Sequence, residues 1–167
     1  MLSTVSALGA QNIGAGKPDR ALQTMRDAAL ISVGFGVLVC AVTQFTAEPV
    51  VSLFTDPATA DGAAVIRLGG QYLRGYVWDC IFAGIHFCFG GYFCACGKSG
   101  ISFFHNILAI ALVRIPGVYL TSRLFPDTLF PMGLATGAGS ILSIIICVIA
   151  FAVIRKKAQS GKQEITL

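Results

Sequence analysis

Four long apolar segments limit what this chain can fold into. They cover about residues 28–51, 75–96, 101–124 and 132–154. Each approximates the length of about 20 residues that an α-helix needs to cross the hydrocarbon core of a bilayer. Because 55% of all residues are hydrophobic and only 12% are charged, a water-soluble fold would leave most of this apolar surface uncovered. The sequence therefore predicts an all-α fold, a polytopic membrane helical bundle with four full transmembrane helices.

A shorter apolar segment, about residues 1–12, precedes a polar, glycine-containing turn. Gly14 and Gly16 in this turn permit positive φ angles and close approach of helices. Pro18 suits the first turn of a new helix, and Asp19 suits the positive end of its dipole. Since the first segment is too short to span a bilayer, we interpret it as the remnant of a membrane helix. On this hypothesis the chain is a C-terminal portion, produced by truncation, a late start codon or a split gene.

The second span has a polar approach, about residues 63–74, which we expect to lie as an amphipathic lead-in at the outer interface. A short external loop, about residues 56–62, precedes it. In the third span Pro116 has no backbone N–H to donate, so it should bend the helix or loosen one of its turns. A polar tail, residues 155–167, follows the last span.

Basic residues orient the four spans. Short loops with more Lys and Arg face the cytoplasm. One side collects Lys17, Arg20, Arg26, Lys98, Arg155, Lys156, Lys157 and Lys162, whereas the other holds Arg67, Arg74 and Arg123. We therefore expect the glycine-containing turn and the C-terminal tail to be cytoplasmic in a multi-pass protein of the plasma membrane.

Several function classes do not fit this pattern. The six cysteines lie within apolar segments, where a thiol behaves as a small hydrophobe, and the spacing of Cys94 and Cys96 is too short for a zinc knuckle. We expect no metal and no cofactor. The net charge of +4 comes from residues at the ends of apolar segments, which indicates membrane topology rather than nucleic-acid binding. The acidic residues are scattered without a catalytic constellation, so we do not expect an enzyme.

The polar turn also carries a resemblance. Its residues Gln11, Asn12, Gly14, Ala15, Gly16 and Arg20 resemble a motif close to Gln-Asn-x-Gly-Ala-Gly-x-x-x-Arg-Ala, which follows the eighth helix of the multidrug and toxic compound extrusion (MATE) transporters. The segment from Gln71 to the Gly97-Lys98 turn is similar to the tenth helix of that family, and Val113 to Pro116 is similar to the eleventh. Residues 1–167 would then be a partial C-terminal lobe, from the end of helix eight to helix twelve.

This resemblance implies part of an antiporter that exports drugs and toxins in exchange for Na⁺ or H⁺. Its partners would be the lipid bilayer, the missing N-terminal lobe of the same transporter and a small-molecule, often cationic, substrate. Because alternating access needs two lobes, we expect the chain to be inactive alone. The alternative is a stand-alone structural or accessory integral membrane subunit.

Asp79 and Arg114 are the candidate site residues, because ionisable groups within a span are costly and often functional. In cation-coupled relatives an acidic residue on the tenth helix belongs to the coupling site, and the resemblance implies that Asp79 is its counterpart. It could instead reach the interface, or pair with Arg74 or Arg114. With a rise of 1.5 Å per residue, the depths of Asp79 and Arg114 differ by roughly 6 Å, so we predict a contact between them. Snorkelling of Arg114 to the outer interface is the alternative.

Other intramembrane polar residues have less specific interpretations. His86 and His105 are each alone on apolar helices, which favours packing over a proton relay. Small residues of the last span form a face that favours close helix packing over substrate contact: Gly133, Thr136, Gly137, Ser140 and Ser143. Thr43 and Gln44 could line a cavity or hydrogen-bond across helices.

Overall fold

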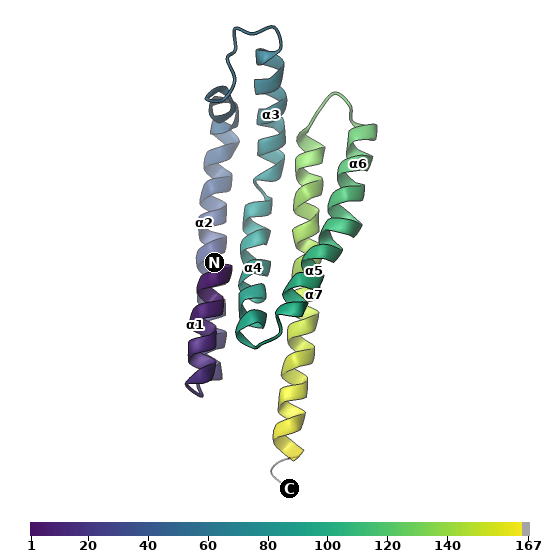
Figure 1. Cartoon of the computed structure of the whole chain (residues 1–167). Coiled ribbons are helices and arrows are strands. Elements are labelled where there is room, and N and C mark those ends of the chain that lie inside the picture. The colour runs from purple at the N-terminus through teal and green to yellow at the C-terminus, as the bar shows by residue number, and fades with distance from the viewer. Residues whose placement is uncertain (165–167) are drawn as a thin grey trace.

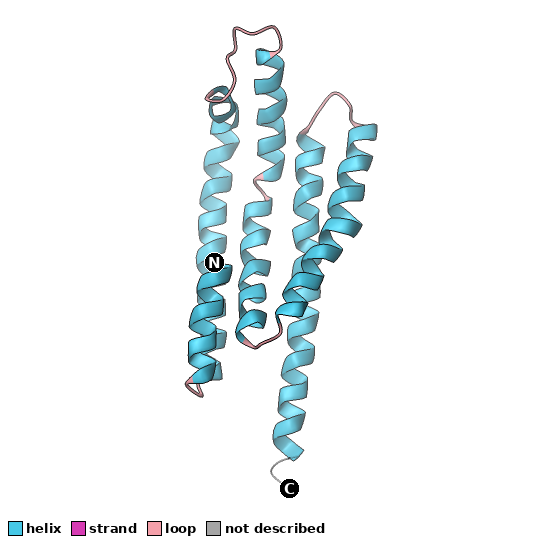
Figure 2. Cartoon of the chain, viewed as in Figure 1, coloured by secondary structure: helices cyan, strands magenta, loops and turns pink. Residues whose placement is uncertain are grey.

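The computed structural model describes residues 1–164, with side chains described up to Lys156. All of its regular elements are helical (Figure 2), in the order α1 (Leu2–Gly14), α2 (Pro18–Ser52), α3 (Gly62–Tyr76), α4 (Asp79–Ala95), α5 (Ser99–Ala109), the π-helical turn η1 (Ile110–Arg114), α6 (Ile115–Leu124) and α7 (Phe130–Glu164). Within the described residues there is no strand. The predicted all-α class is confirmed.

The helices form an elongated bundle in which α4 is central (Figure 1). It packs against α1 and α2 on one side and against α5 and α7 on the other, while α3 precedes it at an angle and packs between α2 and α7. Three continuous helical stretches are long and apolar enough to cross a membrane, Pro18–Ser52, Ser99–Leu124 and Phe130–Lys156. The bent pair α3 and α4 supplies a fourth span when it is counted as one.

The turn between α1 and α2 is a helix cap followed by a helix start. Gly16 has φ 72°, and the N–H of Lys17 donates to the carbonyl of Asn12 at 2.8 Å, which satisfies a carbonyl at the end of α1. Pro18 opens α2 with Asp19 in its first turn, as predicted. Of the two glycines that permit a positive φ in this turn, only Gly16 adopts one, because Gly14 is the last residue of α1.

The second span is broken where the sequence predicts a continuous helix. Residues 63–74 and 75–96 were expected to run into one another at about Gly75, whereas α3 ends at Tyr76 and α4 starts at Asp79 with a bend of 43°. At the break, the N–H of Cys80 donates to the carbonyl of Val77, three residues earlier, so the helix tightens there. At this bend α7 crosses α3 closely. A Cβ on Gly133 of α7 would lie only 2.5 Å from the carbonyl oxygen of Tyr72.

The third span contains the loosened turn that Pro116 predicts. The backbone from Ile110 to Arg114 is π-helical and precedes α6, whose second residue is Pro116. A proline removes one helical donor, and a wider turn relieves the contact between its ring and the preceding turn. Arg114 lies at the end of this turn, so the proline affects where its side chain projects.

Two helices extend beyond the apolar segments. α2 begins at Pro18, ten residues before the span expected at about residue 28, and α7 continues to Glu164 where a tail from residue 155 was expected. Arg, Lys, Ala and Gln are good helix formers, which favours these extensions. The extension of α2 is also packed, because Ala21 and Met25 are buried in the core. The positions of the Lys157 and Lys162 side chains, and residues 165–167 of the expected tail, lie outside the described part.

Candidate functional site

Asp79 is buried at the bend of the second span. It is the first residue of α4 and has an exposed fraction of 4%. A carboxylate in the first turn of a helix interacts favourably with the unpaired N–H groups at that end. The break between α3 and α4 therefore places a buried negative charge at a helix N-terminus inside the bundle.

The structure brings Asp79 and Arg114 together. The guanidinium Nη2 of Arg114 donates to Oδ2 of Asp79 at 3.1 Å and to the hydroxyl of Ser140 on α7 at 2.9 Å. The side chain of Arg114 is 27% exposed, so the pair has one partner in the interior and one nearer the surface. Three spans thus meet at this ion pair.

The polar contacts continue along α7 from the ion pair. The hydroxyl of Ser140 lies 3.4 Å from Nε2 of His86 on α4, and the imidazole ring of His86 lies edge-on to that of His105, with 5.6 Å between their centroids. The hydroxyl of Ser143 donates to the carbonyl of His105 at 3.5 Å. His86 and His105, each expected to be a lone packed residue, are neighbours in a buried polar row.

Several buried polar atoms of this row make no hydrogen bond with the described residues. They are Oδ1 of Asp79, Nε of Arg114, Nδ1 of His86, and both ring nitrogens of His105. Buried polar groups are nearly always satisfied, so each such atom calls for an explanation. For Asp79 the consequence is chemical: one carboxylate oxygen is held by Arg114, and the other can accept a cation or a proton.

Glycines on α7 make room for the ion pair. A Cβ on Gly139 would lie 2.6 Å from Cγ of Arg114, so a side chain there would displace the arginine. A Cβ on Gly137 would lie 3.6 Å from the backbone nitrogen of Asp79, an ordinary contact. The prediction of close packing is confirmed at Gly133, whereas Gly137 leaves room for a methyl group. No sequence pattern indicated that Gly139 shapes the arginine site.

Arg74, the other predicted partner for Asp79, is engaged elsewhere. It pairs with Glu48 of α2 at 3.1 Å and exchanges two hydrogen bonds with Gln44, one in each direction between side chain and backbone carbonyl. Gln44 thus bonds across helices, one of the two roles considered for it. A basic partner for Glu48 could have been expected from the sequence, because an unpaired carboxylate close to the end of a span is costly.

The motif residues of the first turn lie away from the ion pair. Gln11, Asn12, Gly14, Ala15, Gly16 and Arg20 are at the end of the bundle where α4 finishes, whereas Asp79 starts α4 (Figure 1). Gly9 of α1 approaches Ala95 at that end. In the structure these residues cap α1 and start α2 and do not contribute to the polar row. Within the described residues no cluster of three His, Cys, Asp or Glu could hold a metal.

Comparison with known proteins places this geometry in a family. A family model described as MatE matches residues 1–120, which include both Asp79 and Arg114. No curated protein and no solved structure matches the chain.

Proposed function

The chain belongs to the MatE family of multidrug and toxin efflux transporters, and on this premise we propose that Asp79 is the cation-coupling residue of such a transporter, with Arg114 as its exchangeable partner. The chain is thus a multi-pass membrane protein. The coupling cation would be Na⁺ or H⁺. One observation carries the proposal: Oδ2 of Asp79 accepts a hydrogen bond from Arg114, whereas Oδ1 has no hydrogen-bond partner among the described residues.

The proposed coupling is a competition for one negative charge. Without a coupling cation, Arg114 neutralises Asp79. When Na⁺ or H⁺ binds the carboxylate, the attraction of Arg114 for Asp79 falls, and its guanidinium keeps the hydroxyl of Ser140 as a partner. Arg114 compensates the carboxylate in the cation-free state and the bound Na⁺ or H⁺ does so in the other, so neither state buries an uncompensated carboxylate. The cation-bound site carries one extra positive charge, and the side chain of Arg114, which is 27% exposed, can reach solvent.

The bend between α3 and α4 can transmit this exchange. Transporters of several folds place their ion sites at the ends of broken helices near the membrane midplane. Asp79 is the first residue after such a break, and α7 crosses there through Gly133. We propose that exchange of the partner of Asp79 changes the angle between α3 and α4, which moves one end of the second span relative to α7.

Cation binding to the purified chain tests the proposal. In lipid nanodiscs, radioactive Na⁺ binding and proton uptake, followed with a pH indicator, should together reveal one saturable cation site. Asp79→Asn should weaken that site at least about tenfold, a free-energy loss of about 1.4 kcal/mol or more. Asp127→Asn, which removes an exposed carboxylate from the loop before α7, is the control and should bind like the wild type. A site that survives Asp79→Asn would refute the assignment.

Substrate movement is proposed to require a second lobe. Alternating access moves two repeats around a shared cavity, and the described helices form a single bundle. The chain alone in proteoliposomes should therefore bind cations and not move a cationic dye across the bilayer. Dye transport by the chain alone would contradict this part of the proposal. Basic residues at the α1–α2 turn and the end of α7 support a cytoplasmic position for both, in the plasma membrane.

A further inference from the structure

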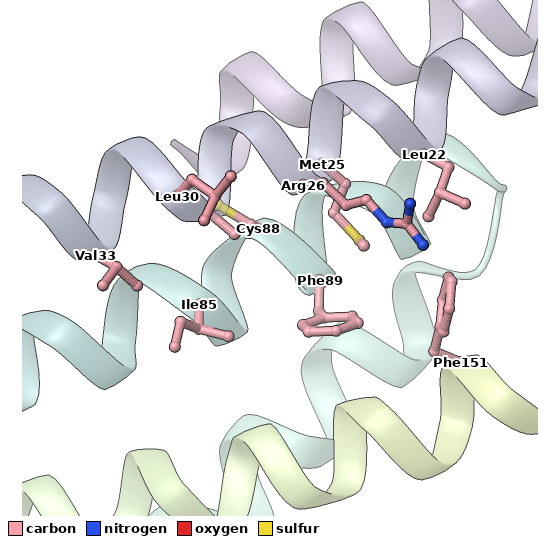
Figure 3. Close-up of a pocket in the computed structure, with 10 residues that line it drawn as sticks. Leu22, Met25, Arg26, Leu30, Val33, Ile85, Cys88, Phe89 and Phe151 are labelled. Carbon is pink, nitrogen blue, oxygen red and sulfur yellow. The ribbon is translucent and has the colours of Figure 1, made fainter.

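A cavity between α2, α4 and α7 is distinct from the ion pair. It has a volume of about 550 Å³ and is lined by apolar side chains with a single charged residue, Arg26 (Figure 3). Figure 3 shows Ile85, Phe89 and Phe151 below the ribbon of α2, with the guanidinium of Arg26 at the end of the cavity near Phe151. Its apolar lining makes it a site for hydrocarbon rather than for an ion.

A charged cavity adjoins the apolar one. It has a volume of about 590 Å³, shares Leu22, Arg26 and Leu30 with the first cavity, and adds Asp19, Gln23, Asp27 and Arg155. The guanidinium of Arg155 lies 5.8 Å from the ring centroid of Phe151, which joins the apolar wall to the charged end. The two cavities are therefore one groove, apolar along the span and charged where the apolar segments of α2 and α7 give way to polar sequence.

The charges of this groove match a zwitterion. Arg26 and Arg155 supply two cations, and Asp19 and Asp27 supply two carboxylates. A phosphate would meet the guanidinium groups, for which it is a preferred partner, and an ammonium group would meet the carboxylates. Basic pockets between transmembrane helices near the cytoplasmic surface are known to bind the phosphate groups of lipids.

We propose that this groove binds one phospholipid with a phosphoethanolamine head group. An acyl chain lies against Ile85 and Phe89, the phosphate lies between Arg26 and Arg155, and the ammonium lies near Asp19 or Asp27. Leu30, 72% exposed and shared by both cavities, forms an apolar rim through which a lipid can enter from the bilayer. This inference does not depend on the proposed cation site.

Native mass spectrometry of the chain, delipidated in detergent and titrated with defined lipids, tests the proposal. Phosphatidylethanolamine should bind with a stoichiometry of one and at least about tenfold more tightly than phosphatidylglycerol, which lacks the ammonium group. Equal or tighter binding of phosphatidylglycerol would overturn the proposed head group. Absence of a resolved one-to-one complex would overturn the site.

Two variants locate the bound lipid. The double variant Arg26→Ala with Arg155→Ala should bind phosphatidylethanolamine at least about tenfold more weakly than the wild type. The matched control, Lys17→Ala with Lys98→Ala, removes the same charge from loops at the same end of the bundle and should bind like the wild type. Ile85→Trp, which fills the apolar part without changing charge, should also lower binding. Equal losses in both double variants would show attraction by net charge alone and would overturn the proposal.

Discussion

Arg114→Met should destabilise the chain by about 3 kcal/mol. Removal of one partner of a buried ion pair leaves the other charge uncompensated, which costs about 3–5 kcal/mol. Asp79 is the interior member and has no other partner among the described residues, whereas Arg114 is partly exposed, so the lower end of that range applies. Unfolding of the purified chain in mixed micelles, followed by circular dichroism, measures this loss.

A second substitution separates the ion pair from packing. The double variant Asp79→Asn with Arg114→Met removes both charges and keeps similar volumes, so it should regain much of the stability that Arg114→Met loses. Lys98→Met removes an exposed cation from a loop and should leave stability nearly unchanged. If the double variant is as unstable as the sum of the two single variants, the ion pair does not stabilise the bundle.

Moving Arg114 away from Asp79 should tighten cation binding at least about tenfold. Two charges about 4 Å apart at an effective dielectric constant of about 20 interact with about 4 kcal/mol, and a coupling cation must overcome this attraction. Gly139→Ala displaces the arginine while keeping its charge, because the added Cβ would lie 2.6 Å from Cγ of Arg114. The Na⁺ or H⁺ affinity of the nanodisc-embedded chain measures the effect.

Gly137→Ala is the matched control for this prediction. It adds the same methyl group two residues away on α7, where the nearest atom would be at 3.6 Å, so cation affinity should remain that of the wild type. Weaker or unchanged binding in Gly139→Ala would contradict the idea that Arg114 and the cation compete for Asp79. Because neither substitution alters a charged residue, a difference between them reports the position of Arg114.

The spans could be predicted from sequence because hydropathy sets their length, and the loosened turn could be predicted because Pro116 lacks a donor. The contact between Asp79 and Arg114 followed from matching their depths in antiparallel helices. Its third member, Ser140, could not be identified, because the rotation of α7 about its axis depends on packing through Gly133 and Gly139. The same holds for the neighbouring rings of His86 and His105.

The bend before Asp79 had only a weak sequence signal, a glycine at position 75. Neither Val77 nor Trp78 is a helix breaker, and a single glycine at position 75 does not by itself distinguish a bend from a continuous helix. The break coincides with the crossing of α7 near Tyr72, a contact between segments about 60 residues apart in the chain that hydropathy and local propensity do not report. The groove of Arg26 and Arg155 likewise joins helices distant in sequence.

Infrared difference spectroscopy of the chain in nanodiscs tests the central claim most directly, because it detects the carboxylate of Asp79 and the guanidinium of Arg114 at the same time. Addition of Na⁺, or a step from neutral to mildly acidic pH, should shift the bands of both groups together as the cation replaces the arginine. Both shifts should vanish in Asp79→Asn and persist in Asp127→Asn. If saturating Na⁺ and acidification both leave the Asp79 bands unchanged, this carboxylate is not a cation-coupling site and the ion pair is purely structural.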